Sequence, residues 1–569
     1  MGASGSAAPA VAVLGLEAAA LGSANYPRPE AAPEIGYGTA GFRTAADVLD
    51  NVMYRMGILA ALRSKALDGK SVGVMITASH NPERDNGVKL VEPMGEMLPQ
   101  EWEAHATKLA NTPDDRLAIV LEELVKLLGI DLNINAIVVV GRDTRSSSVR
   151  LALALCDGAG ALRPSLVRSI GVVTTPQLHY VVRCQTDPTF GSPSVLGYQD
   201  KLMRAFKELF SIATTKPVLY KPEIKVDCAC GVGALALSTM VARAKEAGLS
   251  ITLVNLNSSE PGKLNEGCGA DFVKIQQTAP AGATLSAGDR WVSLDGDADR
   301  AVYFYSREQA FCLLDGDRIA LLLASYMQKL IAQTGVAGIR LGLVQTAYAN
   351  GASTTAAKQL LGEDQIVFAK TGVKHCHHAA LDFDVGIYFE ANGHGTVIFS
   401  AAFVQAVGYV ASGEGTYQSM ATLREARNSA GQLLLFRDLI NEAVGDAISN
   451  FLAVEAILRL LDWDADKWRD MYDDLPNRQI KVVVSDRSIF ETTDAERICV
   501  KPEGLQAQID ELVQKVPKGR SFVRPSGTED CVRVYVEAET LQATLELGQA
   551  VVDLVYAKAG GVGNKPVVA

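Results

Sequence analysis

The sequence predicts a mixed α/β protein of several domains. Short buried strands alternate with helical segments along most of the chain, which favours parallel or mixed sheets between layers of helices. After residue 450 a last strand and helix form a smaller unit. The length of 569 residues is typical of about three to five domains.

The composition excludes several classes of protein. Hydrophobic residues make up 48% of the chain and charged residues 21%, an ordinary globular balance. The net charge of -11 disfavours a nucleic-acid surface, and no charge-free run reaches transmembrane length. The nine cysteines include no C-x-x-C pair, and the N-terminus lacks the basic residues of a targeting peptide. We therefore expect a cytoplasmic protein with no nucleic-acid or membrane partner. The composition does not determine the oligomeric state, for which we expect a monomer.

The stretch ITASHNP (76–82) carries the first candidate site. A buried apolar run from Val72 to Ile76 predicts a strand that leads into it. Pro82 prevents a helix from continuing through the preceding residue, so Ser79 is expected on a turn with an exposed hydroxyl. We call residues 77–82 the serine loop.

Three basic side chains accompany this serine. His80 is adjacent, and Lys89 follows Asp85–Gly87, which predicts a turn. Arg43 ends the stretch GTAGFR (38–43), where glycines allow close backbone approach and the guanidinium can bind phosphate. These groups are candidates for proton transfer and charge compensation at a nucleophilic serine, and an ordinary polar turn is the alternative.

Three aspartates alternate between two predicted strands, 291–294 and 301–305. They are Asp295, Asp297 and Asp299, and residues 295–300 are called the aspartate loop. Carboxylates this close repel one another unless a cation compensates them, and oxygen ligands suit Mg²⁺. An EF-hand would need a glutamate at the twelfth position, where this chain has serine. A solvated acidic turn is the alternative.

Polar residues also follow the predicted strand 385–389. This sugar loop (390–395) contains Glu390, Ala391, Asn392 and His394. Carboxylate and amide groups can hydrogen-bond sugar hydroxyls, although a polar turn is an equal alternative. Before it, Lys374 and His375 open a predicted helix and are expected to face a phosphate or sugar. His378 is expected to pack, because neighbouring helical positions do not share a face.

The last candidate site is a phosphate loop (524–529) in the small C-terminal unit. It contains Arg524, Pro525, Ser526, Gly527 and Thr528, and Arg533 lies on the strand that follows. Backbone N–H groups, hydroxyls and guanidinium groups together can bind a phosphate. A hairpin would bring the two arginines to one end of this unit.

The order of these four loops resembles the α-D-phosphohexomutase superfamily. ITASHNPE from Ile76 and NGVKLVEP from Asn86 are similar to the serine loop of one branch, the phosphoacetylglucosamine mutase family. EANGHG from Glu390 has that branch's asparagine where glucose and mannose mutases usually carry serine, and TGVKH from Thr371 is also similar. The long N-terminal leader and Cys376 depart from the family pattern.

The resemblance implies a four-domain, heart-shaped phosphohexomutase architecture. Three similar mixed α/β domains would precede a smaller C-terminal domain of the TATA-box-binding-like type. Together with the predicted strands, it divides the chain into a flexible leader (1–34), domain 1 with the serine loop (35–200), domain 2 with the aspartate loop (201–313), domain 3 with the sugar loop (314–450) and domain 4 with the phosphate loop (451–569).

The resemblance also implies the chemistry. Ser79 would carry a covalent phosphate and bind one Mg²⁺ together with Asp295, Asp297 and Asp299. N-acetylglucosamine 6-phosphate and N-acetylglucosamine 1-phosphate would interconvert through a sugar bisphosphate, in the biosynthesis of UDP-N-acetylglucosamine. Ser79, His80, Lys89 and Arg43 would be catalytic. The implied substrate-binding residues are Lys374, Glu390, Ala391, Asn392, His394, Arg524, Pro525, Ser526, Gly527, Thr528 and Arg533.

Three other functions remain open. A phosphoglucomutase or phosphomannomutase would act by the same chemistry on another sugar. A serine–metal phosphatase would also use serine and aspartate, but it has no use for a sugar loop. A non-enzymatic binding protein is disfavoured because the serine and all three aspartates are present.

Overall fold

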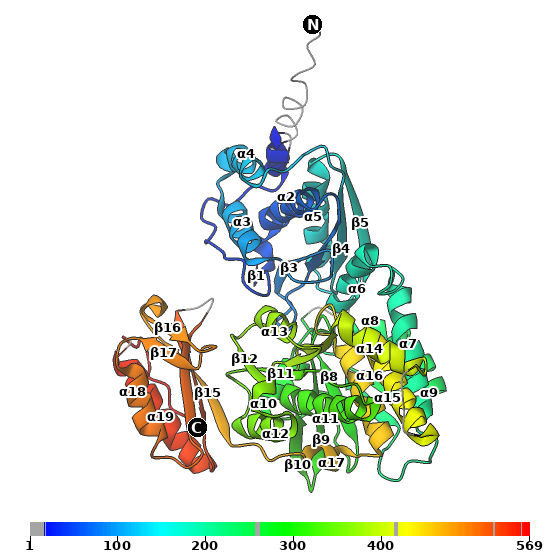
Figure 1. Cartoon of the computed structure of the whole chain (residues 1–569). Coiled ribbons are helices and arrows are strands. Elements are labelled where there is room, and N and C mark those ends of the chain that lie inside the picture. Colours follow the sequence, from blue (N-terminus) through cyan, green and yellow to red (C-terminus); the bar gives the residue numbers. More distant parts are fainter. Residues whose placement is uncertain are drawn as a thin grey trace. The chain divides into compact units, whose positions relative to one another are not determined.

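The structure is a computed structural model of the chain, and it describes residues 16–17, 19–256, 262–414, 419–526, 530–558 and 560–568. Two compact units make up the chain, which Figure 1 draws with its elements labelled. The first unit comprises Met1–Lys216, Lys221–Leu313 and Leu435–Ala456, and the second comprises Pro217–Tyr220, Leu314–Leu434 and Ile457–Ala569. Within the described ranges, no helix is both long enough and apolar enough to span a bilayer.

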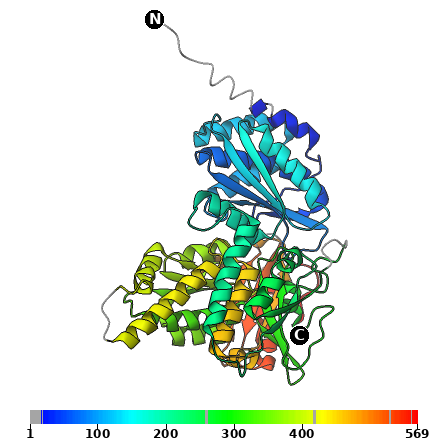
Figure 2. The same cartoon turned by 90° about the vertical axis from the view of Figure 1, so that its right-hand side faces the viewer.

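The first unit begins with a five-stranded mixed sheet, blue and cyan in Figure 2. Its strand order is β1-β3-β2-β4-β5. The parallel pairs are β2 with β4 and β4 with β5, whereas β3 runs antiparallel to β1 and β2. The strands are β1 (Phe42–Ala45), β2 (Ser71–Ile76), β3 (Asp85–Val91), β4 (Ala136–Arg142) and β5 (Ser165–Val172).

Helices cover both faces of β2. On one face α2 (Asp50–Ala66) and α5 (Ser148–Ala161) pack so closely that a Cβ on Gly158 would lie 1.8 Å from the carbonyl oxygen of Tyr54. On the other face lies α6 (Thr175–Thr186), where a Cβ on Gly73 would lie 2.7 Å from Val182. Because successive side chains of a strand alternate between faces, β2 is buried on both sides. It therefore holds the start of the serine loop firmly.

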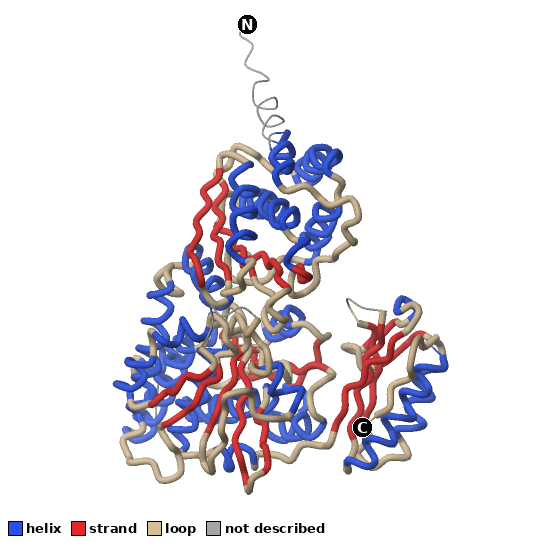
Figure 3. Tube along the Cα trace, turned by 180° about the vertical axis from the view of Figure 1, so that it is seen from behind, coloured by secondary structure: helices blue, strands red, loops and turns tan. Residues whose placement is uncertain are grey.

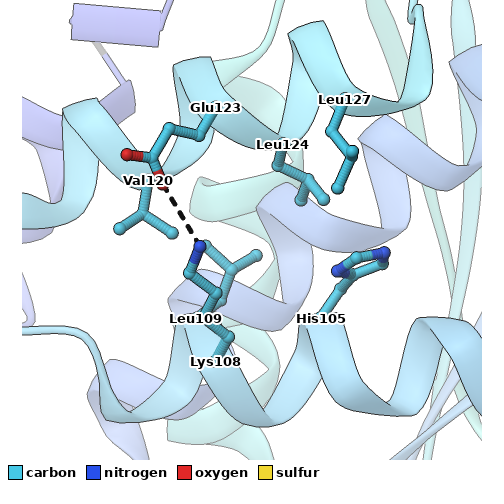
Figure 4. A pocket seen from close by; sticks show the side chains of 7 residues that line it. All are labelled: His105, Lys108, Leu109, Val120, Glu123, Leu124 and Leu127. Carbon is cyan, nitrogen blue, oxygen red and sulfur yellow. Dashed lines mark hydrogen bonds and ion pairs between the residues drawn. The ribbon is translucent and has the colours of Figure 1, made fainter.

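The other helices of this part surround the sheet. They are η1 (Ser23–Asn25), η2 (Ala46–Val48), α3 (Gln100–Asn111), η3 (Asp114–Arg116), α4 (Leu117–Leu128) and α7 (Val195–Ile212). A cavity of about 320 Å³ lies between α3 and α4 (Figure 4). Its lining consists of His105, Lys108, Leu109, Val120, Glu123, Leu124 and Leu127, which include no predicted site residue.

A second five-stranded sheet completes the first unit, in the order β10-β9-β8-β6-β7. The β6–β7 and β6–β8 pairs are parallel, whereas β8 and β9 are antiparallel. Tyr303 on β9 donates to the carbonyl of Phe451 at 3.1 Å, which ties in the distant segment with α16. The elements are β6 (Glu223–Asp227), α8 (Gly233–Ser238), α9 (Val241–Ala247), β7 (Ser250–Val254), α10 (Ala270–Gln276), β8 (Arg290–Leu294), β9 (Ala301–Arg307), β10 (Ala310–Leu314) and α16 (Ala447–Leu461).

The second unit contains a four-stranded mixed sheet in the order β12-β11-β13-β14. Its last pair, β13 and β14, is an antiparallel hairpin that carries the sugar loop. The elements are α11 (Gly316–Thr334), β11 (Leu341–Thr346), α12 (Gly351–Leu361), η4 (Glu363–Gln365), β12 (Ile366–Ala369), α13 (Val373–Ala380), β13 (Val385–Phe389), β14 (Gly395–Phe399), α14 (Ala401–Ala411), α15 (Met420–Leu439) and α17 (Ala465–Arg469).

The C-terminal part of the second unit is a small antiparallel sheet in the order β15-β19-β18. Two helices, α18 and α19, cover one of its faces (Figure 3) and bury a valine-rich core against it. The elements are β15 (Asn477–Val483), η5 (Arg487–Ile489), β16 (Glu491–Thr493), β17 (Ile498–Lys501), α18 (Leu505–Val513), β18 (Arg520–Pro525), β19 (Cys531–Glu537) and α19 (Leu541–Lys558).

The mixed α/β class predicted from the sequence is confirmed, and three local expectations differ. Asp85–Gly87 is not a turn but the start of β3. A Cβ on Gly87 would lie 2.7 Å from the carbonyl oxygen of Thr77, so a residue without a side chain is needed there. The stretch 185–199 is rich in Gly, Pro, Ser and Thr, which predicts a domain boundary or a long loop, but α7 already begins at Val195. Ala19, expected in a flexible leader, is fully buried and accepts a hydrogen bond from Tyr54. The division into four domains stays a prediction.

Candidate active site

Ser79 lies three residues beyond the end of β2 and is fully buried. Its hydroxyl donates a hydrogen bond of 2.7 Å to Asp295 Oδ2. The expectation of an exposed hydroxyl is therefore wrong, because the aspartate loop lies directly against it. The serine loop and the aspartate loop, 216 residues apart in sequence, form one site within the first unit.

The backbone of Ser79 is held in an unusual conformation. Its φ of 52° lies in the left-handed region, which is costly for a residue with a Cβ. The Ser79 N–H donates to Thr77 Oγ1 at 3.0 Å. Its carbonyl oxygen accepts from Arg145 Nη2 at 3.1 Å and from Asn265 Nδ2 at 2.9 Å. These contacts fix the direction in which the hydroxyl points.

The three aspartates of the aspartate loop converge as predicted. Each offers an oxygen within 4.8 Å of those of the others, and all three side chains are buried. Asp295 Oδ1 accepts from the backbone N–H groups of Asp299 and Arg300, which closes the loop tightly. Burial, together with the charges of Asp299 and Asp297, raises the pKa of Asp295 well above its ordinary value. The cluster thus favours a bound positive charge.

The donor set fits a magnesium ion. Asp297 Oδ2 accepts from Thr175 Oγ1 at 2.7 Å and from Thr77 Oγ1 at 3.3 Å, which orients this carboxylate. Its other oxygen, Oδ1, is buried and has no hydrogen-bond partner in the described part of the chain. Three carboxylates and a serine oxygen are the hard ligands that Mg²⁺ prefers, with room for water or substrate oxygens.

Basic side chains gather around the same carboxylates. Lys89 Nζ lies 3.2 Å from Asp299 Oδ2 and 3.4 Å from Asp297 Oδ2. Arg300 Nε lies 3.7 Å from Asp299 Oδ1 and 3.9 Å from Asp295 Oδ2. Because Lys89 lies on β3, the strand that replaced the expected turn also directs this lysine at the aspartates.

His80 and Arg43 belong to this basic group. The charge of Arg300, burial and the charge of Arg43 lower the pKa of His80 to about 2. Burial, and then the charge of Arg300, lowers the pKa of Arg43. The imidazole is therefore neutral at physiological pH in this arrangement, and several cationic groups share a small volume. Such a volume attracts a multiply charged anion such as a phosphate.

In the second unit the sugar loop forms a tight hairpin turn. Glu390 N–H donates to the His394 carbonyl at 2.9 Å, and His394 N–H donates to Asn392 Oδ1 at 3.0 Å. Asn392 Nδ2 lies 3.4 Å from Glu390 Oε2, and Ala391 is buried. The glutamate and asparagine side chains are thus brought together, as sugar binding would require.

The helix α13 begins next to this loop. The N–H of Gly372 donates to Glu390 Oε1 at 3.1 Å, which brings the start of α13, with Lys374, to the sugar loop. The expectation that His378 packs is wrong, because His377 is the buried histidine and contacts Tyr388 OH at 3.2 Å. The helix begins at Val373, and this register turns positions 376, 377 and 380 inward.

The arginine of the phosphate loop and the arginine on the strand that follows face each other, as the hairpin prediction requires. Arg524 on β18 pairs directly with Arg533 on β19. Arg524 Nε donates to Tyr348 OH at 3.0 Å, and its Nη1 lies 3.2 Å from Glu496 Oε1. Pro525 ends β18 and Ser526 is buried, whereas Gly527 and Thr528 lie outside the described residues.

Glu496 connects the phosphate loop to the segment that contacts the sugar loop. Its second oxygen accepts the N–H of Thr371 at 2.9 Å, and the neighbouring Gly372 N–H is bound by Glu390. One carboxylate therefore joins Arg524 to the segment that precedes α13. No sequence pattern singled out Glu496.

Sequence reasoning also missed three contacts of the first unit. Arg145 lies in the stretch GRDTR (141–145), whose pattern predicts only the end of a buried strand. Thr77 lies in the serine loop, yet its role in holding Ser79 and Asp297 depends on the fold. Asn265 carries no local signal, since the serine-loop partners of its side chain are more than 180 residues away.

Comparisons with known proteins show which family the chain is similar to. Models described as phosphoacetylglucosamine mutase AMG1, domain II and domain III, match residues 193–302 and 315–463. Models of phosphoglucomutase/phosphomannomutase match residues 57–117 (α/β/α domain I) and 480–554 (C-terminal domain). The phosphoacetylglucosamine mutase of Homo sapiens is 47% identical over 535 residues, which cover 94% of this chain and 96% of the human protein.

Two solved structures extend the comparison. Aspergillus fumigatus N-acetylphosphoglucosamine mutase in complex with GlcNAc-6P and magnesium superposes with a TM-score of 0.89 at 46% identity, covering 96% of this chain and 99% of that one. A serine-to-alanine variant of the same enzyme in complex with glucose 1,6-bisphosphate gives a TM-score of 0.88 at 45% identity, covering 98% of this chain and 100% of that one. The chain therefore belongs to the phosphoacetylglucosamine mutase family of the α-D-phosphohexomutase superfamily.

Proposed function

We propose that this chain interconverts N-acetylglucosamine 6-phosphate and N-acetylglucosamine 1-phosphate, as a phosphoserine enzyme in UDP-N-acetylglucosamine biosynthesis. The observation that carries the proposal is the hydrogen bond of 2.7 Å between Ser79 Oγ and Asp295 in a buried cluster of three aspartates. A hydroxyl in this position can carry a phosphate whose charge the cluster's cation and nearby basic groups offset. The family membership supports the same reaction.

The residues proposed to hold Mg²⁺ are Ser79, Asp295, Asp297 and Asp299. When bound, the ion offsets negative charge on the phosphoryl group during transfer. Lys89 directs its charge at the same place, because its ammonium lies 3.2 Å from Asp299. We assign Arg43, His80 and Lys89 to proton transfer and charge compensation around the phosphate.

Each step of the proposed reaction transfers one phosphoryl group between Ser79 and the sugar. The bond between phosphorus and Ser79 Oγ breaks as a bond forms to O1 of N-acetylglucosamine 6-phosphate. The O1 proton passes to a basic group, and Ser79 Oγ regains a proton from the same set. The sugar 1,6-bisphosphate then reorients in the site. Its 6-phosphoryl group is transferred back to Ser79 Oγ by the reverse exchange, which leaves N-acetylglucosamine 1-phosphate.

The side chains proposed to bind the sugar and the non-transferring phosphate belong to the second unit. Glu390, Asn392 and His394 would bind hydroxyls in either orientation of the intermediate, with Ala391 shaping the turn. Lys374 would add a positive charge beside them. Arg524 to Thr528 and Arg533 would bind the phosphate, and the direct pairing of the two arginines supports this role.

Side-by-side turnover of N-acetylglucosamine, glucose and mannose phosphates tests the proposal. The expected result is the highest kcat/KM for the N-acetylated sugar and no net release of inorganic phosphate. A preference for glucose or mannose phosphate would favour the second candidate, a phosphoglucomutase or phosphomannomutase. Steady phosphate release would identify a phosphatase instead.

We also propose that the protein acts as a cytoplasmic monomer without a nucleic-acid or membrane partner. The net charge of -11 supports the absence of a general nucleic-acid surface. Light scattering after size exclusion would test the oligomeric state. Limited proteolysis would test the four-domain division, with cuts expected in exposed connections near the predicted boundaries and not within the helices and strands.

A further inference from the structure

Asn265 binds the serine loop through two carbonyl groups at once. Its Nδ2 donates to the carbonyl oxygen of Ser79 at 2.9 Å and to that of Asn81 at 3.0 Å. The first acceptor belongs to the peptide that follows the reacting serine, and the second lies two residues further along the serine loop. Since an amide nitrogen has two hydrogens in one plane, both bonds can form together and fix the direction of this peptide.

Arg145 binds the same two carbonyls but comes from a different part of the fold. Its Nη2 lies 3.1 Å from Ser79 O and 2.7 Å from Asn81 O. It follows β4, which belongs to the same sheet as β2. Arg145 therefore holds the serine loop against its own sheet, and it does not connect that loop to the sheet that carries the aspartates.

Asn265 makes this connection. Its backbone N–H donates to the carbonyl of Ala229 at 3.0 Å, and Ala229 follows β6. Within the second sheet β6 pairs with β8, the strand that leads directly into the aspartate loop. The side chain of Asn265 thus relates the position of Ser79 to the sheet that positions its carboxylate partners.

The aspartate loop leaves space for this contact. A Cβ on Gly296 would lie 2.6 Å from the carbonyl oxygen of Ser79 and 2.9 Å from Asn265 Nδ2. The serine carbonyl, the asparagine amide and the aspartate-loop backbone thus meet where even a methyl group does not fit. A shift of any one of them moves the other two.

We propose that Asn265 is a positioning residue for phosphoryl transfer, which holds the left-handed backbone of Ser79 in register with the aspartate loop. The inference rests on the proposed function of Ser79. It predicts that losing the amide leaves substrate binding nearly intact, because the proposed sugar and phosphate contacts lie in the other unit. The loss instead misplaces the phosphoryl group, and small misplacements reduce reaction rates strongly.

The chain offers a matched control in Asn255. Both asparagines have a left-handed backbone, with φ of 60° at Asn265 and 53° at Asn255. Asn255 Nδ2 also donates to two oxygens, those of Asp227 (2.7 Å) and Ala281 (3.0 Å), but neither lies in the serine loop. Glycine tolerates this backbone conformation, so Asn265→Gly and Asn255→Gly delete the amides without backbone strain.

The experiment compares kcat, KM and the single-turnover phosphorylation of Ser79 by glucose 1,6-bisphosphate in the unchanged chain and both variants. For Asn265→Gly we expect kcat and the phosphorylation rate to fall by roughly 10- to 100-fold, with little change in KM. Asn255→Gly should lose about as much thermal stability as Asn265→Gly but retain the kcat of the unchanged chain. Hydrogen exchange should accelerate in the serine loop of Asn265→Gly but not of Asn255→Gly.

Equal kinetic losses in the two variants would overturn the proposal, because they would show a general effect of stability. A raised KM with unchanged kcat would also overturn it. If Asn265→Gly does not fold, Asn265→Asp, which keeps the size and replaces the donor by an acceptor, must show the same loss of kcat. Phosphorylation of Ser79 in the unchanged chain tests the proposed function separately, so the two failures are distinguishable.

Discussion

Lys89 Nζ lies 3.2 Å from Asp299 Oδ2, although 210 residues separate them in sequence. The contact brings a cation to the aspartate loop, whose Asp295 accepts the hydrogen bond of the Ser79 hydroxyl. A lysine this close to two carboxylates reduces their mutual repulsion and can shift toward a phosphate once a metal ion binds them. The following predictions depend on this balance of charge.

Replacing Asp297 by asparagine should weaken Mg²⁺ binding by at least about tenfold, since changes even to groups behind a metal's ligands cost that much. Two threonines orient Asp297 through its Oδ2. Its Oδ1 has no hydrogen-bond partner among the described residues. Calorimetric titration with Mg²⁺ measures the affinity. Asp289→Asn, which alters a carboxylate paired with Lys225, is the control. Equal affinities in the two variants would make the aspartate loop a structural turn.

Removing the Arg524 side chain should raise KM for the sugar phosphate by roughly tenfold or more, because a charge-assisted contact of about 1.5–3 kcal/mol is lost. The variant should also release the bisphosphate intermediate and depend on added sugar bisphosphate. Steady-state kinetics of Arg524→Ala measure both effects. The control is Arg520→Ala, which removes another arginine of β18 and breaks its ion pair with Glu537 of β19; it should lower Tm but keep KM. A normal KM for Arg524→Ala would place the phosphate elsewhere.

Substitution of Glu496 by glutamine should lower KM by about threefold to tenfold, the range expected for weakening one charge-assisted contact. The Glu496 carboxylate lies 3.2 Å from Arg524 Nη1 and accepts the Thr371 N–H at 2.9 Å. A phosphate could bind both of these donors if the carboxylate did not. Glutamine keeps the shape and removes the competing charge. Inhibition by inorganic phosphate should strengthen in parallel. An increase in KM would instead assign Glu496 to orienting the arginine.

The buried Lys201 should make stability depend on pH in the alkaline range. Burial lowers the pKa of Lys201 to about 8, below the value of 10.5 in the unfolded chain. Between these values the unfolded chain binds the extra proton, so the free energy of unfolding rises with pH. The Tm of the unchanged chain should therefore rise relative to that of Lys201→Met from pH 8 to pH 10. A constant difference would show that the amine stays charged when folded.

Local sequence patterns predict the groups proposed to react. They do not predict the side chains that hold those groups in place. Three carboxylates at alternate positions are informative on their own, because their repulsion demands a cation. Asn265, by contrast, acts through a contact with Ser79 that spans 186 residues, and no local pattern encodes it. Its importance depends on which segments the two sheets bring together.

The errors have equally physical causes. Glycine is typical of a turn, but Gly87 lies in β3. It is needed there because the backbones of Phe42 and Thr77 approach it too closely for any side chain. The choice between His377 and His378 depends on where α13 begins, and a shift of one residue exchanges the two faces. Ser79 was expected to be exposed because its cover, the aspartate loop, is distant in sequence.

The central claim is that Ser79 carries the transferred phosphate, and peptide mapping by mass spectrometry tests it most directly. The unchanged chain is incubated with glucose 1,6-bisphosphate and digested, with Ser79→Ala as the control. The account predicts one phosphate on the peptide that contains Ser79, its loss on addition of N-acetylglucosamine 6-phosphate, and neither phosphate nor mutase turnover in the variant. Phosphate on another residue, or turnover by Ser79→Ala, would contradict the account.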